Sequence, residues 1–505
     1  MTNPDPWIAS LDCATPAKLV KAALRSLQRP IEELLLVGAD DRQVPVNGRN
    51  RYGFPIADLT PHFRGSSCTT TPPDAIALGD AARWRDDLVE TINAAGSFPS
   101  TDALRAPAVA GILDLLGLSQ RHEANVVLTP SGTDSELFMT ALSLGGHERR
   151  LRNILVGSAE AGSGTKCAAS GRAFSQRTPF AACVELNSAI DGLAVDRVSV
   201  VDIELRDHRG RARRPFDVEA EIEAHVEHAL ESGERVLVHA MAGSKTGICQ
   251  ISPAWVQTWR SRYPEALRVV VDAAQVRISN SELRAYLRAG ASVSLTGSKS
   301  LSAAPFCGAL ILDTASLEDA RNLVEGGEHL AQGLRNYFSA ADLPIGLVGL
   351  IRDLEPVDLG LLARWAVARA ETRRRLLVPA IDREDLTIRL HDELVLGLDT
   401  IPGVCVFPTS SPSIVAFSLL NARSEIMGKD ALRDAYSTLV AEPGVHIGQP
   451  VELVPHGPAV LRFAIGSATI TRGYETPGDA ALDGARLARE ALEVLGPLCR
   501  DVVLV

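Results

Sequence analysis

The 505-residue sequence predicts an α/β protein: a large domain with a mostly parallel sheet covered by helices, followed by a smaller C-terminal α/β domain. Three observations lead to this expectation. Short apolar segments alternate with helical segments between residues 80 and 312, a pattern typical of right-handed crossovers between parallel strands. The chain is too long for a single core. The pattern of helix-like and strand-like segments also changes after a long helical segment at 359–377.

The elements of the large domain follow from length and periodicity. Apolar segments of strand length are expected to be buried strands, and apolar residues at helical spacing are expected to form the helices between them. Pro107 suits the first turn of one of these helices. The predicted strands are 125–129, 153–157, 198–203, 235–239, 267–271, 292–296 and 308–312. The predicted helices are 16–27, 108–116, 135–144, 218–231, 253–263 and 282–289.

The C-terminal part mixes helices with strand-like segments. Its predicted helices are 359–377, 390–398 and 479–495, and its predicted strands are 404–407, 414–419 and 460–465. Residues 448–453 read as a loop. We therefore expect an N-terminal arm at 1–75, a large domain at 76–340 and a small domain at 341–505.

Composition excludes several classes of protein. With 46% hydrophobic and 22% charged residues the chain resembles an ordinary soluble protein. Its formal charge of −11 argues against a nucleic-acid partner. The eight cysteines form no C-x-x-C pair and no H-E-x-x-H occurs, so no metal is expected. Without a signal peptide or a membrane-length apolar run, we expect a cytoplasmic protein with no membrane partner.

Familiar nucleotide and hydrolase motifs are incomplete. The runs 162–166 and 243–246 are rich in glycine and hydroxyl residues, but neither contains the adjacent Gly-Lys of a Walker loop. No G-x-S-x-G is present, which argues against a serine hydrolase.

The most informative residues are Lys299 and Asp272. Lys299 lies among small hydroxyl residues after the strand ending at Thr296, and the chain has only six lysines against 45 arginines. Asp272 ends an apolar strand. A pyridoxal phosphate (PLP) site needs such a pair: the aspartate holds the protonated ring nitrogen, and the lysine forms a Schiff base and shuttles the proton at Cα. The alternative is a solvated lysine and a helix-capping aspartate.

Hydroxyl residues supply candidates for the phosphate side. Ser131, Gly132 and Thr133 follow a strand and open a helix, where free N–H groups and hydroxyls bind a phosphate. A plain helix cap by Ser131 or Thr133 is the alternative. Thr296 and Ser298 flank the turn that carries Lys299 and could hold the phosphate as well.

Substrate contacts are expected from two other places. Arg462 lies inside an apolar strand and needs an anionic partner, either a substrate carboxylate or an internal Asp or Glu. Arg51 and Tyr52, with Asn50, lie in an ordered loop of the N-terminal arm and are candidate substrate contacts.

In this order along the chain, the segments from about 80 to 470 resemble fold-type-I PLP enzymes, specifically the aminotransferase class V and cysteine desulfurase superfamily. The resemblance implies that Gln275, in Asp-x-x-Gln, contacts the cofactor's ring oxygen, and that Ser244 replaces a family asparagine there. It matches Thr296, Ser298 and Lys299 to the family's Ser-x-His-Lys, and Arg462 to its carboxylate-binding arginine. It also implies a homodimer whose sites form at the subunit interface.

Two departures from the family pattern matter. The run 158–164 has no aromatic residue to stack on the cofactor ring, so small residues, or something from elsewhere in the fold, would cover that face. The loop at 448–453 has no cysteine, which argues against a persulfide-forming desulfurase.

The expected function is therefore that of a PLP-dependent enzyme acting on an amino acid or amine. Aminotransfer is the first expectation. A lyase that eliminates sulfur or another β or γ group is second, and a decarboxylase or a carbon–carbon bond-forming enzyme is third. The alternative is a protein that has the fold of PLP enzymes and binds a ligand but catalyses no reaction.

Overall fold

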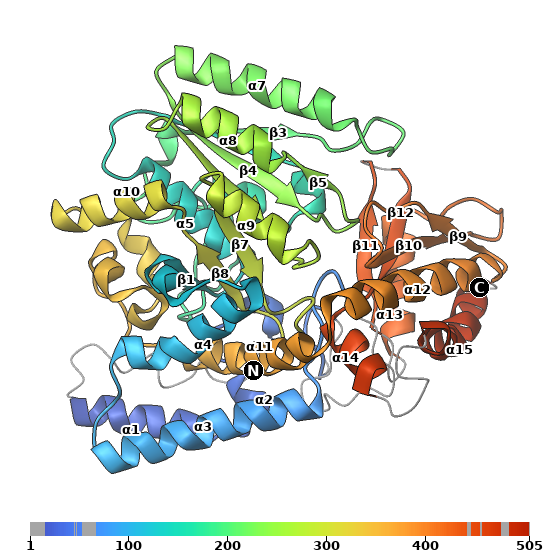
Figure 1. Ribbon diagram of the computed structural model, residues 1–505, viewed down its shortest axis with the longest axis horizontal. Helices are drawn as coiled ribbons and strands as arrows, with labels where there is room; N and C mark the ends of the chain where they lie inside the picture. The colour runs from blue at the N-terminus through green and yellow to red at the C-terminus, as the bar shows by residue number, and fades with distance from the viewer. Residues whose placement is uncertain are drawn as a thin grey trace.

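The computed structural model describes residues 16–44, 46, 48–52, 67–441, 446–454, 457–475 and 484–503. Figure 1 shows a large body of helices around a sheet, with a smaller body containing a second sheet beside it. This is the predicted arrangement of a large and a small α/β part.

The large sheet is mostly parallel, as predicted. Its strand order is β1-β8-β7-β6-β4-β2-β3, with β5 paired to β4. Strand β8 runs antiparallel to both of its neighbours, and β2, β3, β4, β6 and β7 pair in parallel. The strands are β1 (Val126–Thr129), β2 (Leu151–Val156), β3 (Val198–Ile203), β4 (Arg235–Ala242), β5 (Cys249–Gln250), β6 (Leu267–Asp272), β7 (Ser292–Thr296) and β8 (Gly308–Ile311).

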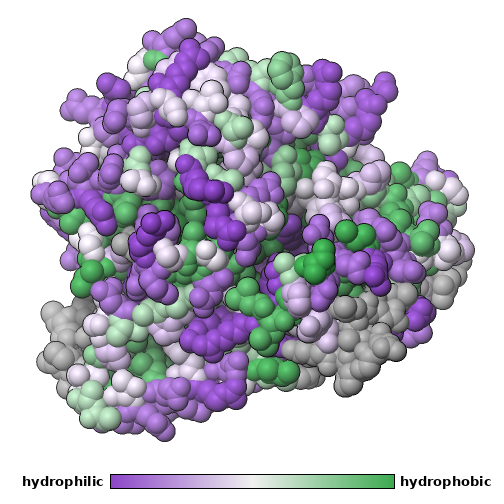
Figure 2. Space-filling model, viewed as in Figure 1, coloured by the Kyte–Doolittle hydropathy of each residue, from purple (hydrophilic) through white to green (hydrophobic). Residues whose placement is uncertain are grey.

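Helices cover both faces of this sheet, which is why the central strands β4, β6 and β7 are buried at almost every position. Val236 and Val238 of β4 face one core, whereas Leu237 between them faces another. The first core receives α7 (Pro215–Glu231), α8 (Pro253–Arg262) and α9 (Asn280–Arg288), and the second receives α5 (Gly132–Leu144) and α10 (Thr314–Glu325). Hydrophilic residues dominate the outer surface over α7 in Figure 2.

The small sheet is antiparallel, in the order β11-β12-β10-β9. Its strands are β9 (Val404–Phe407), β10 (Ile414–Leu419), β11 (Gly448–Glu452) and β12 (Ala459–Ala464). Its helices are α12 (Ala380–Asp399), α13 (Lys429–Ala441), α14 (Ser467–Glu475) and α15 (Gly484–Val503). The predicted loop at 448–453 is thus mostly strand, because its backbone pairs with β12. The predicted start of the last helix, 479–483, lies outside the described residues.

The N-terminal segment is more helical than the sequence suggested. Helices α1 (Pro16–Leu27), α2 (Ile31–Leu34) and α3 (Ala75–Ala95) pack with α4 (Thr101–Leu116) and α11 (Leu359–Leu377), as Figure 1 shows. Helix α4 begins six residues before Pro107, where Ser100 caps it by accepting from the Ala103 N–H at 3.2 Å. Pro107 is therefore inside the helix, and its expected first-turn position is wrong.

The hydrophobic core of the small sheet begins at Val378, directly after α11, which packs against helices of the large body. The predicted division into segments 1–75, 76–340 and 341–505 stays a prediction. Within the described residues, no helix has both the length and the apolar character that a membrane crossing needs.

Candidate active site

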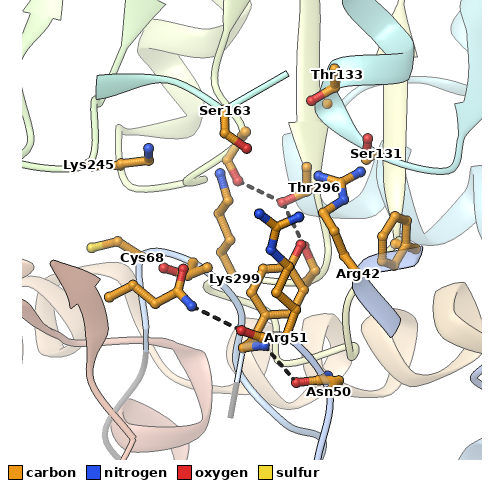
Figure 3. Close-up of a pocket in the computed structure, with 18 of the residues that line it drawn as sticks. Arg42, Asn50, Arg51, Cys68, Ser131, Thr133, Ser163, Lys245, Thr296 and Lys299 are labelled. Atoms are coloured by element: carbon orange, nitrogen blue, oxygen red, sulfur yellow. Dashed lines mark hydrogen bonds between the residues drawn. The ribbon is translucent and has the colours of Figure 1, made fainter. Parts of the chain in front are cut away.

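A cavity of about 590 Å³ opens at the carboxyl ends of β6 and β7, where the N-terminal segment and the small sheet also meet it (Figure 3). Ten of the twelve predicted site residues line it: Arg51, Tyr52, Ser131, Gly132, Thr133, Asp272, Thr296, Ser298, Lys299 and Arg462. The structure thus brings together residues separated by more than 400 positions in the sequence.

Lys299 and Asp272 share this cavity. Asp272 is the last residue of β6 and lies opposite Ser294 of β7, and its Oδ1 accepts from the Ala274 N–H at 2.9 Å. Lys299 lies three residues beyond the end of β7. Burial lowers the pKa of Lys299, and the charge of Asp272 partly opposes that shift. A lowered pKa favours the neutral amine, which is the nucleophilic form.

The loop that carries Lys299 is fixed by two distant segments. The Ser298 carbonyl accepts from the Thr71 N–H at 2.8 Å and from the Thr70 hydroxyl at 3.2 Å. The Ser300 carbonyl accepts from the Ser467 N–H at 2.8 Å. Farther along, Ser302 adopts a positive φ of 52°, a conformation that costs energy for a residue other than glycine. The loop that carries Lys299 is therefore held in place by hydrogen bonds to distant parts of the chain.

The phosphate candidates lie around the N-terminus of α5. Ser131 precedes the 13-residue helix, but its side chain caps no backbone N–H; its hydroxyl donates instead to the Asp134 carboxyl at 2.5 Å. Burial raises the pKa of Asp134 to about 7. Thr296 donates to the Ala274 carbonyl at 2.8 Å, and Ser298 donates to Thr296 at 3.3 Å. Hydroxyls and a helix N-terminus thus converge on one end of the cavity.

Ser244 and Gln275 lie behind the cavity wall. The Ser244 hydroxyl donates to the buried carboxylate of Glu160. The Gln275 amide donates to the Cys68 carbonyl at 2.9 Å, while its oxygen has no hydrogen-bond partner among the described residues. Neither side chain lines the cavity, so their contact with the cofactor's ring oxygen stays a prediction.

Arg462 enters the cavity from the small sheet. Its side chain is 1% exposed. Nη2 donates to the Gln449 carbonyl, Nη1 donates to the Lys245 carbonyl at 3.5 Å, and Nε has no partner among the described residues. No carboxylate of the described chain pairs with it, so the internal salt bridge is not observed there. Gly448 makes room for this guanidinium, since a Cβ there would lie 3.0 Å from Nη2.

The N-terminal segment adds both predicted and unpredicted groups. The Tyr52 N–H donates to Asn50 Oδ1 at 3.0 Å, and the Arg51 carbonyl accepts from Gln449 Nε2 at 3.2 Å. Arg42, which the sequence did not single out, pairs with Asp40 at 2.6 Å and lies 4.7 Å over the Phe306 ring. Figure 3 shows Arg42 beside Ser131. No sequence motif identifies Arg42 as a site residue, because only the tertiary fold brings it close to α5.

The run 158–164, which was predicted to lack an aromatic residue over the cofactor, contributes small residues to the cavity. Gly162 and Ser163 line the cavity there. Glu160, 4% exposed, turns away and accepts from Arg206, Ser244 and Thr246. These contacts fix the turn at 244–246 that carries Lys245, a second lysine lining the cavity. Small residues therefore line this wall, and their position over a cofactor ring stays a prediction.

Two further groups of the wall were not expected. Glu136 of α5 lines the cavity and pairs with His239, which is buried in the middle of β4 instead of ending that strand. Burial raises the pKa of Glu136. Cys68 also lines the cavity, so a thiol is present although the loop at 448–453 has none. Within the described residues no group of three His, Cys, Asp or Glu side chains could hold a metal.

Comparison with known proteins identifies the fold of the chain but does not assign it to a family. No family model and no curated protein matches the sequence. The structure of Oryza sativa TDC with PLP and tryptamine is 15% identical, with a TM-score of 0.52 over 87% of this chain and 83% of that one.

Two other structures are similar to the same degree. Catharanthus roseus tryptophan decarboxylase with L-tryptophan is 14% identical, with a TM-score of 0.52 over 88% of this chain and 84% of that one. The cystine C–S lyase C-DES with cysteine persulfide is 15% identical, with a TM-score of 0.52 over 82% of this chain and 94% of that one. The chain therefore has the fold of the fold-type-I PLP-dependent enzymes, as the sequence predicted.

Proposed function

We propose that the protein is a PLP-dependent enzyme that acts at the α-carbon of an amino acid or amine, with Lys299 as the residue that binds the cofactor covalently. The observation that carries this proposal is the shared cavity of Lys299 and Asp272 at the ends of adjacent strands. The similar fold of a protein solved with PLP supports it.

The residues of the cavity fit this cofactor at both ends. The first turn of α5, the hydroxyls of Ser131, Thr133 and Ser298, and the Arg42 guanidinium suit a phosphate. Asp272 suits a protonated ring nitrogen, since only its Oδ1 is used by the backbone. When bound, PLP supplies an electron sink for the bonds of the α-carbon.

Each catalytic role then follows from the chain's own chemistry. Lys299 has the lowered pKa that an attacking amine and a proton carrier at Cα need. Asp272 holds positive charge on the ring side. Arg462, buried and with an unused Nε, orients a substrate carboxylate with its planar fork. Ser163 and Gly162 leave the facing wall open for a substrate.

The reaction type is a narrower proposal. The similar structures include a tryptophan decarboxylase and a cystine C–S lyase, which supports decarboxylation or elimination ahead of the aminotransfer first expected from the sequence. Aminotransfer remains the second candidate. The two differ in a simple observable: aminotransfer converts the cofactor to its amine form when amino acid alone is added, whereas a lyase releases product and leaves the cofactor spectrum restored.

The test begins with the covalent link. Purified protein is incubated with PLP, reduced with borohydride and digested, and the labelled peptide is mapped by mass spectrometry. We expect label on Lys299. Label on Lys166 or Lys245, or no absorbance band after PLP addition, would contradict the proposal. A panel of amino acids then assigns the reaction by detection of CO₂, keto acid or amine, and turnover excludes a purely binding protein.

We also propose a homodimer, which rests on the resemblance in sequence alone, and keep the cytoplasmic location as an expectation from the sequence. Light scattering behind size-exclusion chromatography gives the mass of the particle directly, and a monomeric mass would contradict the dimer. Fractionation of cells that express the protein tests the compartment.

A further inference from the structure

Basic side chains greatly outnumber acidic ones on the cavity wall. The two acidic residues that line it are Glu136, paired with His239, and Asp272. The basic ones are Arg42, Arg49, Arg51, Lys245, Lys299, Arg433 and Arg462. A cofactor phosphate and one substrate carboxylate do not account for this excess of positive charge.

Lys245 is one of three members of this set with no role so far, together with Arg49 and Arg433. It follows β4, and Figure 3 shows it near Ser163 and Lys299. Its ammonium forms no ion pair within the described part of the chain, although its backbone is fixed: its N–H donates to the Glu160 carbonyl at 3.2 Å, and its carbonyl accepts from Arg462. A fixed lysine next to the carboxylate-binding candidate is placed on the substrate side.

We infer, on the basis of the proposed function, that Lys245 binds a second acidic group of the substrate, so that the substrate is an amino acid with an acidic side chain. Arg462 takes the α-carboxylate and Lys245 takes the distal one. An anion there is chemically favoured because it neutralises two cations that otherwise repel each other.

The electrostatics of Lys245 support this assignment. Burial, followed by the charges of Arg462 and Lys299, lowers its pKa to about 7. A bound anion reverses part of that shift, since an opposite charge nearby favours the protonated amine. Binding of a dianionic ligand above pH 7 must therefore be accompanied by proton uptake, and its affinity must fall as the pH rises.

The experiment compares two five-carbon acids on the PLP-loaded protein by isothermal titration calorimetry. Glutarate carries two carboxylates and valerate carries one, so their chain lengths match. We expect glutarate to bind at least about tenfold more tightly than valerate, in line with a charged hydrogen bond. At pH 8, titration in buffers of different ionisation enthalpy should show more proton uptake for glutarate than for valerate.

Variants assign the effect to one side chain. Lys245→Gln should reduce the preference for glutarate to about threefold or less and abolish its proton uptake, whereas Lys245→Arg should keep the preference. Lys166→Gln is the matched control, because Lys166 is an exposed lysine paired with Asp202 at 2.6 Å. Equal affinities for the two acids in the unmodified protein, or a preference that survives Lys245→Gln, would overturn the inference.

The same samples separate this inference from the proposed function. The cofactor band is recorded before each titration. A normal band with no preference for glutarate refutes the role of Lys245 and leaves the PLP proposal standing. A preference for glutarate with no cofactor band refutes the PLP proposal and leaves an anion site at Lys245.

Discussion

Nη1 of Arg462 donates to the backbone carbonyl of Lys245 at 3.5 Å, which joins the small sheet to the turn after β4. The guanidinium is thereby oriented by backbone atoms and keeps its charge available for a ligand. Both of its partners named above are carbonyls, from Gln449 and Lys245. A carboxylate is the anion that completes such a planar donor.

Arg462→Lys keeps the charge and removes the planar fork. We expect valerate affinity to fall by about tenfold or more, because a bidentate charged contact becomes a single one. Calorimetry on the PLP-loaded protein measures this loss. Arg389→Lys is the control, as Arg389 is 60% exposed in its pair with Asp385. Unchanged affinity in Arg462→Lys would remove Arg462 from the substrate site.

Asp272→Asn removes the charge proposed to face the cofactor's ring nitrogen. A charge-assisted hydrogen bond contributes about 1.5–3 kcal/mol, so PLP affinity should fall by roughly ten- to a hundredfold. Titration of the cofactor absorbance measures the Kd. The exposed Asp217→Asn, on α7, should leave the Kd unchanged. If both variants bind PLP equally, Asp272 does not contact the ring.

Gly448→Ala tests whether β11 needs a glycine at this position to accommodate the Arg462 guanidinium. The new Cβ would meet the Arg462 guanidinium at 3.0–3.2 Å, and crowding of this kind costs about 1–3 kcal/mol. We expect weaker valerate binding together with a lower midpoint of urea unfolding. Gly428→Ala meets nothing within 4 Å and serves as the control. Equal behaviour of the two would show that the guanidinium moves freely.

Glu160→Gln should destabilise the protein strongly. Glu160 is buried with Arg206 at 2.5 Å and accepts from two hydroxyls of the 244–246 turn. Removing one partner of a buried pair costs about 3 kcal/mol, measured as the free energy of unfolding in urea. Asp217→Asn, which breaks a surface pair with Arg214, should change the free energy of unfolding far less, because water screens an exposed ion pair. Similar losses would mean that Glu160 is not a structural anchor.

Lys245→Met should stabilise the ligand-free protein in a pH-dependent way. The pKa of Lys245 is lowered to about 7, so between pH 7 and its ordinary value of 10.5 the unfolded chain binds more protons than the native one. The burial cost of the charge is complete below pH 7 and fades as the pH rises. The gain from Lys245→Met should thus be larger at pH 6.5 than at pH 9.5 in urea unfolding.

Lys166→Met provides the opposite sign in the same measurement. The hydrogen bond to Asp202 raises the pKa of Lys166, so this lysine stabilises the folded protein while it is protonated. Its removal should be neutral or slightly destabilising at both pH values. A gain for Lys166→Met equal to that for Lys245→Met would contradict the burial argument.

The sequence predicted the large sheet well, because apolar strands between amphipathic helices fix both the fold and the edge at which a ligand binds. Asp272 and Lys299 could be found for that reason: each follows a strand that ends at this edge. Helix α3 was not predicted, although most of it lies in the region expected to alternate helices and strands. Strand β11 was missed because its Gly-Gln-Pro start is typical of a turn. Only pairing with β12 makes it a strand.

The rest of the site depends on long-range contacts that no local pattern records. Arg42 and Cys68 reach the cavity from an arm more than 200 residues before Lys299. The Ser244 hydroxyl donates to Glu160, a partner 84 residues away, and its contact with the cofactor stays a prediction. Lys245, next to it, lines the cavity instead. In such a turn, the role of each residue depends on the direction in which its side chain points. Sequence spacing does not determine that direction.

The bond between the Ser467 N–H and the Ser300 carbonyl has a consequence for how the protein can be divided. It fastens the lysine loop of one sheet to the segment that follows the arginine strand of the other. A break in the chain between α11 and α12 would leave each half with its own hydrophobic core. Neither half alone would contain both Lys299 and Arg462, so the proposed chemistry requires the joined molecule.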